Sequence, residues 1–191
     1  MQALPPQHCS SRLLVNSPAG MRQCSRAGEF TEMAIYFVRH AKAGERRVWS
    51  GEDIDRPLSK TGWTQSHALA TRLSTLKPST LLSSPYVRCV QTLEPLAELT
   101  GLDITIEPRI CEYEPFEPVL ELLAEVPDRA VLCSHGDIIP ATIAALERRG
   151  MEITSQADWR KASVWVIKRS KRGRLSKAKA WPPPPRGSKK N

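Results

Sequence analysis

Short apolar runs and longer amphipathic stretches alternate along the chain from Met33 onward. The short runs are rich in β-branched and apolar residues, which is typical of buried strands. They predict strands at Ala34–Val38, Thr80–Ser83, Ile104–Ile106, Ala130–Cys133, Val164–Lys168 and Leu175–Ala180. The longer stretches repeat apolar residues at the spacing of a helix. They predict helices at Thr61–Leu76, Val87–Thr100, Pro118–Glu125 and Ile138–Arg149. Strands that alternate with helices in this way predict the α/β class.

The two ends of the chain lack this pattern. Residues 1–32 show no sustained periodicity and contain several Pro and Gly, so we expect a disordered leader. Met33 stands directly before the first expected strand, which favours a mis-annotated start, with a targeting peptide as the alternative. The 191 residues suit one domain, which we expect at 33–168. A basic, Pro-rich tail at 169–191 follows, and the strand at 175–180 would form the edge of the sheet.

The net charge of +8 is concentrated at the carboxyl end. Residues 168–191 contain ten Lys or Arg and no acidic residue, whereas residues 33–167 contain 15 basic and 18 acidic residues. A short basic tail of this kind is usually a solvated extension. We therefore do not expect nucleic acid as a partner, and no oligomeric state is indicated. No apolar run approaches the roughly 20 residues of a membrane-spanning helix, so no membrane association is expected.

Cysteine and histidine are spaced unlike metal ligands. None of the five cysteines forms a C-x-x-C pair, and the four histidines are scattered. We therefore expect no metal site and no cofactor. The cysteines are expected to be reduced and structural, in a cytoplasmic protein.

Unusual polar side chains follow three of the expected strands. In open α/β sheets, ligands bind outside the carboxyl ends of the strands. The segments at these positions are Arg39-His40, Ser83-Ser84-Pro85-Tyr86-Val87-Arg88 and Ser134-His135-Gly136-Asp137. In a parallel sheet, two arginines and two histidines would converge at one edge. Each segment alone is weak evidence, because an Arg-His pair occurs by chance and a single histidine is usually structural.

Together and in this order, the three segments resemble the histidine phosphatase superfamily, also called the phosphoglycerate-mutase-like fold. The resemblance spans about 33–168, and Arg56-Pro57-Leu58-Ser59-Lys60-Thr61-Gly62 is similar to the family's segment before its first helix. It implies a three-layer α/β/α sandwich on a mostly parallel central sheet of about five or six strands. It also implies that His40 is the nucleophile, with Arg39, Arg88 and His135 binding phosphate. One departure is that Ala41-Lys42 replaces the family's usual Gly-Glu after the Arg-His pair.

The chemistry of phosphoryl transfer independently favours these residue types. The transferred group spreads negative charge over three oxygens, and arginine donates two parallel hydrogen bonds to such oxygens. Arg39 and Arg88 should also disfavour protonation of His40, which leaves a lone pair free to attack. His135 can donate to the same oxygens. We expect a phosphohistidine intermediate that water hydrolyses.

An ester leaving group needs a proton, so a carboxylic acid is expected near the pocket. The segment after the third strand offers Glu112 and Glu114. Glu112 resembles the family's acid in its placement and is our choice for a third catalytic residue beside His40 and His135; both could instead be loop carboxylates. The small phosphohistidine phosphatases of the superfamily resemble this chain in size and lack that acid, since their leaving group is an imidazole.

A closer resemblance is to the histidine-phosphatase domain that follows a Nudix domain in some actinobacterial proteins. It rests on three segments, residues 39–44, 86–92 and 133–140, and on Lys161-Ala162-Ser163-Val164-Trp165-Val166. The resemblance implies a nucleotide or another small phosphorylated metabolite as substrate. Beside the expected pocket, four side chains could bind further phosphates or stack on a base: Lys42, Arg46, Arg47 and Trp49. The alternative interpretation is that these four residues belong to a mobile polar loop.

The sequence therefore predicts a metal-independent phosphatase of a small phosphorylated metabolite, plausibly a nucleotide. The alternative enzymatic function is that of a protein-phosphohistidine phosphatase. A non-catalytic module that binds phosphorylated ligands or nucleic acid is the alternative of another class.

Overall fold

The computed structural model describes residues 33–185, which form an α/β fold around one seven-stranded sheet with the order β3-β2-β4-β1-β6-β7-β5. The strands are β1 (Ala34–Arg39), β2 (Thr80–Ser83), β3 (Ile104–Ile106), β4 (Ala130–Ser134), β5 (Glu152–Ile153), β6 (Val164–Arg169) and β7 (Leu175–Trp181). The helices are α2 (Lys60–Ser74), α3 (Val87–Thr100), α4 (Glu117–Glu125) and α5 (Ile138–Arg148). Three short 3₁₀ turns complete the described elements: η1 (Arg46–Val48), η2 (Asp53–Asp55) and η3 (Pro108–Ile110).

The sheet is mostly parallel, as expected. Strands β3, β2, β4 and β1 run in one direction, and β6 lies antiparallel beside β1. In the pairing of β1 with β4, Arg39 lies opposite Ser134. The antiparallel pairing sets Val38 opposite Val164, so β6 begins where β1 ends. The carboxyl ends of β1, β2 and β4 and the beginning of β6 therefore lie at the same end of the sheet.

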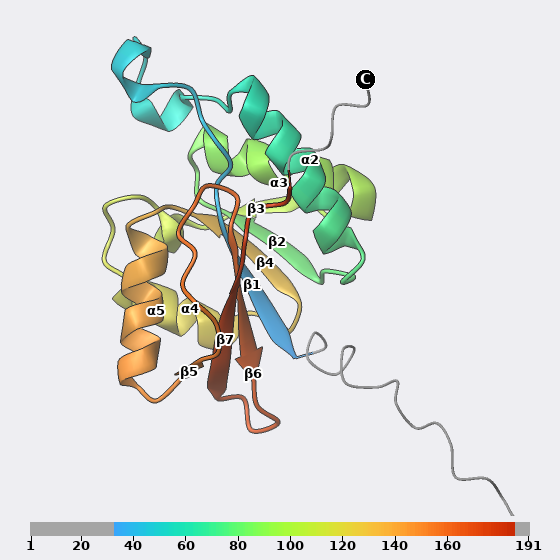
Figure 1. Ribbon diagram of the computed structural model, residues 1–191, viewed down its shortest axis with the longest axis vertical. Helices are drawn as coiled ribbons and strands as arrows, with labels where there is room; N and C mark the ends of the chain where they lie inside the picture. Colours follow the sequence, from blue (N-terminus) through green and yellow to red (C-terminus); the bar gives the residue numbers. More distant parts are fainter. Residues whose placement is uncertain (1–32, 186–191) are drawn as a thin grey trace, which may run out of the picture.

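Two helical layers cover the sheet and confirm the three-layer sandwich. Figure 1 shows α2 and α3 on one face and α4 and α5 on the other. Successive side chains of a strand point to opposite faces, so β1 contributes to both cores. Ile35 and Phe37 belong to the cluster that includes the buried side chains of α4 and α5, whereas Tyr36 and Val38 belong to the cluster with α2 and α3. This full burial explains why β1 reads as a continuous apolar run.

Local signals explain where the helices begin and end. The hydroxyl of Ser59 accepts a hydrogen bond from the backbone N–H of Gly62, which caps α2. Gly62 also lets α2 approach the loop after β1, because a Cβ there would overlap the carbonyl of Lys42. Helix α3 has the bounds expected from the sequence and ends at Gly101, whose φ of 70° is the left-handed conformation that favours glycine.

The carboxyl-terminal part of the sheet differs from the expectation. The sheet has seven strands, because the two-residue β5 is too short to leave a periodic pattern. The strand expected at 175–180 is present as β7, but it is an inner strand: β6 pairs with one side of it and β5 with the other. The sheet thus continues past 168, to Trp181. The expectations for residues 1–32 lie outside the described residues, as does the end of the tail from 186 onward. Within 33–185, no helix is long and apolar enough to cross a bilayer.

We expect a truncation after Ser170 to unfold the protein, because it removes β7 and leaves β6 and β5 without their shared neighbour. Loss of β7 also removes Trp181, whose ring lies 6.0 Å from that of Tyr36. Circular dichroism on heating checks this: the truncated chain should show no cooperative transition. A truncation after Pro185 is the control and should melt like the full chain. Equal melting of both truncations would contradict the structural role of β7.

Candidate active site

His40 lies directly after β1 and is 1% exposed. Its backbone N–H donates to the carbonyl of Ser134, which fixes the residue against the end of β4. The Nδ1 atom lies 2.8 Å from the carbonyl oxygen of Ala41, so Nδ1 is the protonated nitrogen. The lone pair is therefore on Nε2, which lies 2.8 Å from Nζ of Lys161. Nε2 is thus the ring nitrogen whose lone pair can attack an electrophile.

The surroundings of His40 keep its imidazole neutral. Burial, and then the positive charge of Lys161, hold its pKa well below the ordinary value of 6.5. The neighbouring His135, with a ring-to-ring distance of 5.4 Å, and the charge of Arg88 lower this pKa further. A neutral imidazole is the form that can attack an electrophile.

Arg39 ends β1, and its guanidinium packs directly on Gly136. A Cβ at position 136 would overlap this guanidinium, so the close approach requires glycine there. Nη1 donates to the carbonyl of Trp159, whereas the buried Nε has no hydrogen-bond partner within residues 33–185. Burial lowers the pKa of Arg39, and the charges of Asp137 and Glu112 oppose this shift. Contacts with Gly136 and Trp159 thus hold the guanidinium in place.

Arg88, the second residue of α3, is fully buried at the end of the sheet. Nη1 donates to the carbonyl of Asp53 at 2.7 Å and lies 3.1 Å from its Oδ2. Nη2 forms an ion pair with Oε2 of Glu112. The guanidinium carbon lies 4.3 Å from the ring centroid of Tyr86. Two carboxylates thus balance a buried charge that would otherwise be costly.

His135 follows β4 and is fully buried opposite His40. Nε2 lies 2.8 Å from Oγ of Ser84, which fixes the ring. Nδ1 lies 3.5 Å from Nη2 of Arg88 and 4.0 Å from Oε2 of Glu112. Nδ1 therefore faces Arg88 and Glu112.

The structure separates the two candidate acids. Glu112 lies among the site residues through its contacts with Arg88 and His135, and its side chain is 19% exposed. Glu114 is exposed in the loop between η3 and α4. Among the described residues, Glu112 is thus the candidate whose carboxylate reaches the site.

Comparison with known proteins supports the family to which this geometry points. Residues 35–118 match the family described as histidine phosphatase superfamily (branch 1). Over this segment, which is less than half of the chain, the sequence is similar to this superfamily. The chain is 34% identical over 139 residues to the 8-oxo-(d)GTP phosphatase of Mycolicibacterium smegmatis, an alignment that covers 70% of this chain and 43% of the relative. The chain thus spans less than half the length of that relative.

Solved structures show the same fold at lower sequence identity. The protein histidine phosphatase SixA, complexed with tungstate, aligns with a TM-score of 0.60 at 19% identity, over 78% of this chain and 94% of SixA. A mycobacterial glucosyl-3-phosphoglycerate phosphatase aligns with a TM-score of 0.57 at 19% identity, over 78% of this chain and 97% of that protein. These likenesses confirm the predicted superfamily fold.

The four residues expected to bind the rest of a substrate do not lie together. Lys42 lines a cavity beside the site. Arg46 donates to the hydroxyl of Tyr113 at 2.9 Å, and Arg47 forms an exposed ion pair with Glu45. The indole N–H of Trp49 donates to the carbonyl of Glu52. The loop from 46 to 49 therefore has contacts of its own, apart from the Lys42 cavity.

Sequence reasoning missed two residues that lie in this group of side chains. Lys161 reaches Nε2 of His40 from the segment before β6, and Asp53 reaches Arg88 from η2. Partial burial opposes ionisation of Asp53, but a hydrogen bond from Arg56 and the charge of Arg88 hold its pKa below the ordinary value. Lys161 reaches the site because β6 runs antiparallel to β1 and begins where β1 ends, a pairing that the sequence alone did not indicate. No pattern in the sequence indicated Asp53.

No metal site is evident in the part of the chain that the structure describes, where no three His, Cys, Asp or Glu residues lie close enough to hold an ion. The described cysteines, Cys89, Cys111 and Cys133, are free thiols.

The lowered pKa of His40 makes the folding stability depend on pH. In the unfolded chain this imidazole takes up a proton near pH 6.5, whereas in the folded protein it stays neutral to a much lower pH. The unfolded state therefore binds more protons below pH 6.5. The free energy of unfolding falls there by up to about 1.4 kcal/mol per pH unit from this group, until the folded-state pKa is reached.

We expect His40→Gln to remove this pH dependence, because glutamine does not titrate. Urea unfolding of wild type and variant at about pH 7.5 and about pH 5 measures the effect. The free energy of unfolding of the variant, relative to wild type, should rise at the lower pH. A difference that is equal at both pH values would show that His40 is not buried in its neutral form.

Proposed function

We propose that this chain is a metal-independent phosphatase that acts through a phosphohistidine at His40 on a small phosphorylated metabolite such as a nucleotide. The single observation that supports this most is the position of Nε2 of His40. It is buried and deprotonated, it lies 2.8 Å from the ammonium of Lys161, and the charge of Arg88 also acts on the ring. A neutral nucleophile among fixed positive charges suits attack on a phosphoryl group, whose oxygens gather negative charge in the transition state.

The proposed reaction has two displacements at phosphorus. Nε2 of His40 attacks, and the bond from phosphorus to the leaving oxygen breaks with its electron pair on that oxygen. Water then attacks the phosphohistidine, the bond from phosphorus to Nε2 breaks, and inorganic phosphate leaves. Arg39, Arg88 and a proton on Nδ1 of His135 donate hydrogen bonds to the phosphoryl oxygens in both steps.

Glu112 is the proposed general acid. Its carboxyl group lies beside Arg88 and 4.0 Å from Nδ1 of His135, where it can reach a substrate bound to both. In its protonated form it would give a proton to an ester leaving oxygen, and the resulting carboxylate would take a proton from the attacking water. Entry of phosphate between Glu112 and Arg88 would replace the present ion pair.

Two substrate classes remain in the proposal. The name of the Mycolicibacterium relative, an 8-oxo-(d)GTP phosphatase, supports a nucleotide. The ion pair of Glu112 with Arg88 favours the alternative, a protein-phosphohistidine phosphatase. A carboxylate held in an ion pair does not donate a proton to an ester oxygen. An imidazole leaving group does not need this acid. We place the enzyme in the cytoplasm, in keeping with its free thiols.

The first test is phosphate release from nucleoside mono-, di- and triphosphates, sugar phosphates and a phosphohistidine peptide, with a chelator present. We expect turnover of at least one small metabolite, and a loss of at least about a thousandfold in His40→Ala. Turnover of the peptide alone would select the protein phosphatase. Absence of turnover on every substrate would leave only a non-catalytic module.

A second test addresses Glu112 and compares leaving groups. We expect Glu112→Gln to lower kcat by at least about tenfold on an alkyl phosphate, whose leaving oxygen needs a proton. The same variant should change kcat on p-nitrophenyl phosphate much less, because p-nitrophenolate leaves without one. Glu114→Gln is the matched control and should behave as wild type on both. A loss of equal size on both substrates would assign Glu112 to structure.

A further inference from the structure

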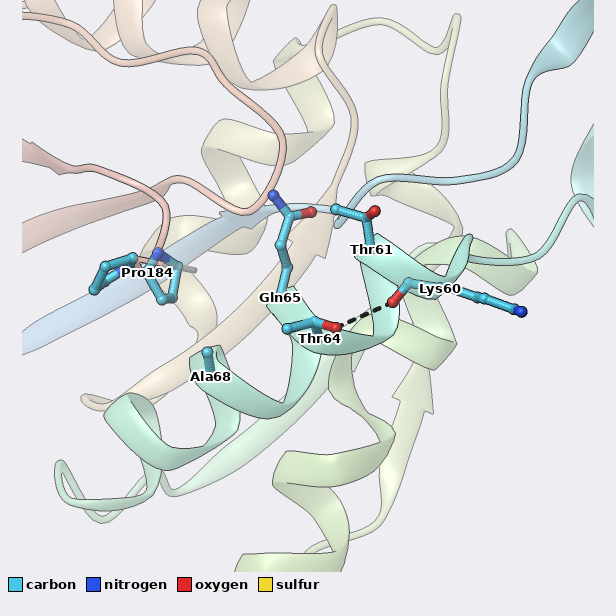
Figure 2. Close-up of a pocket in the computed structure, with 7 residues that line it drawn as sticks. Lys60, Thr61, Thr64, Gln65, Ala68 and Pro184 are labelled. Atoms are coloured by element: carbon cyan, nitrogen blue, oxygen red, sulfur yellow. Dashed lines mark hydrogen bonds between the residues drawn. The ribbon is translucent and has the colours of Figure 1, made fainter. Parts of the chain in front are cut away.

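A cavity of about 650 Å³ lies beside the nucleophile. Its lining comes from the loop after β1, from Arg56, from the first turns of α2, from the segment before β6 and from the chain after β7: Lys42, Ala43, Gly44, Arg56, Thr61, Gln65, Arg160, Lys161, Pro183, Pro184 and Pro185. Figure 2 shows the adjoining pocket, where Thr61 and Gln65 of α2 lie across from Pro184. The chain after β7 thus forms one wall of a space that opens next to the site.

Lys161 connects this cavity with the nucleophile. Its Nζ lies 2.8 Å from Nε2 of His40, and the same residue lines the cavity. A donor hydrogen-bonded to Nε2 lies in the direction of the lone pair, from which phosphorus must approach. Phosphoryl transfer places the leaving group in line with the attacking atom, on the far side of phosphorus. The leaving group should therefore lie on the side of Lys161, toward the cavity.

The lining of the cavity is cationic. It includes four Lys or Arg residues and no carboxylate. Arg56 is held by Asp53 and by the carbonyl of Gly44, and Arg160 is paired with Asp158. Lys42 and Lys161, by contrast, form no ion pair with a carboxylate within residues 33–185. Two lysines beside the site are thus not paired with a carboxylate within residues 33–185.

Binding of an anion beside Lys161 would offset the cost of burying its positive charge. Burial, followed by the charges of Arg39 and Arg88, lowers the pKa of Lys161 to about 8. A negatively charged group in the cavity would stabilise the ammonium form. The arginines of the loop at 46–47 are less suited to this role, because Arg46 contacts Asp53 and Arg47 contacts Glu45.

We propose that Lys161 and Lys42 form a subsite for the second phosphate of a phosphoanhydride substrate, with a nucleoside diphosphate as the representative class. The inference rests on the proposed phosphatase function and narrows its substrate. As the terminal phosphate enters, Nζ of Lys161 leaves Nε2 and binds the second phosphate. Nε2 attacks the terminal phosphorus, and the bond to the bridging oxygen breaks with its electron pair on the departing monophosphate. Water then releases inorganic phosphate from His40, so diphosphate and water give monophosphate and phosphate.

The kinetic test compares substrates with and without a second phosphate. We expect Lys161→Met and Lys42→Met each to lower kcat/KM for a nucleoside diphosphate at least about tenfold more than for p-nitrophenyl phosphate. Lys161→Arg should recover part of the loss for the diphosphate. The control is Lys171→Met, which removes one exposed positive charge in the turn between β6 and β7, at the opposite end of the sheet. Equal losses on both substrates would overturn the subsite.

A binding measurement separates this inference from the proposed catalytic function. Calorimetry on His40→Ala, which cannot form the intermediate, compares inorganic pyrophosphate with inorganic phosphate. We expect pyrophosphate to bind at least about tenfold more tightly, and the preference to be lost when Lys42→Met is added. If pyrophosphate is preferred but the wild type shows no turnover, the subsite stands and the proposed catalytic function is rejected. Equal binding of the two anions would reject the subsite even if the enzyme is active.

Discussion

The parallel pairing of β1 with β4 is the constraint on which the site depends. It sets Arg39 opposite Ser134, so the two histidines that follow these strands lie with ring centroids 5.4 Å apart. The register also brings the guanidinium of Arg39 onto Gly136, where any larger residue would displace it. A shift by one residue would turn the apolar side chains of β1 to the opposite faces. The two hydrophobic cores therefore hold the register that aligns the site.

Burial of positive charge is the second constraint. Arg88 is fully buried, Arg39 has a buried donor without a partner among the described residues, and Lys161 lies against His40. Uncompensated charges of this kind cost several kcal/mol each. The carboxylates of Asp53 and Glu112 offset the charge of Arg88. In the proposed reaction, a phosphate dianion would take over this role.

Much of the fold could be predicted because its elements have strong periodic patterns. Helix α3 has the expected bounds, and β1, β2, β4 and β6 lie where apolar runs indicated them. The two-residue β5 leaves no pattern, and it exists because β7 offers it a hydrogen-bonding edge. The position of β7 within the sheet likewise depends on pairing between distant segments. Local sequence therefore determined the elements, whereas pairing determined their order in the sheet.

The sequence by itself determined the residue types of the site. Arg39, His40, Arg88 and His135 could be named because each follows a strand or begins the helix after one, and parallel strands end at one edge. Only the tertiary structure decided that Glu112 rather than Glu114 reaches this group, and that Lys161 and Asp53 join it. Those three residues come from loops and turns, whose paths are set by contacts with distant segments. A strand end can be located from local periodicity, but the direction of a loop side chain depends on the packing around it.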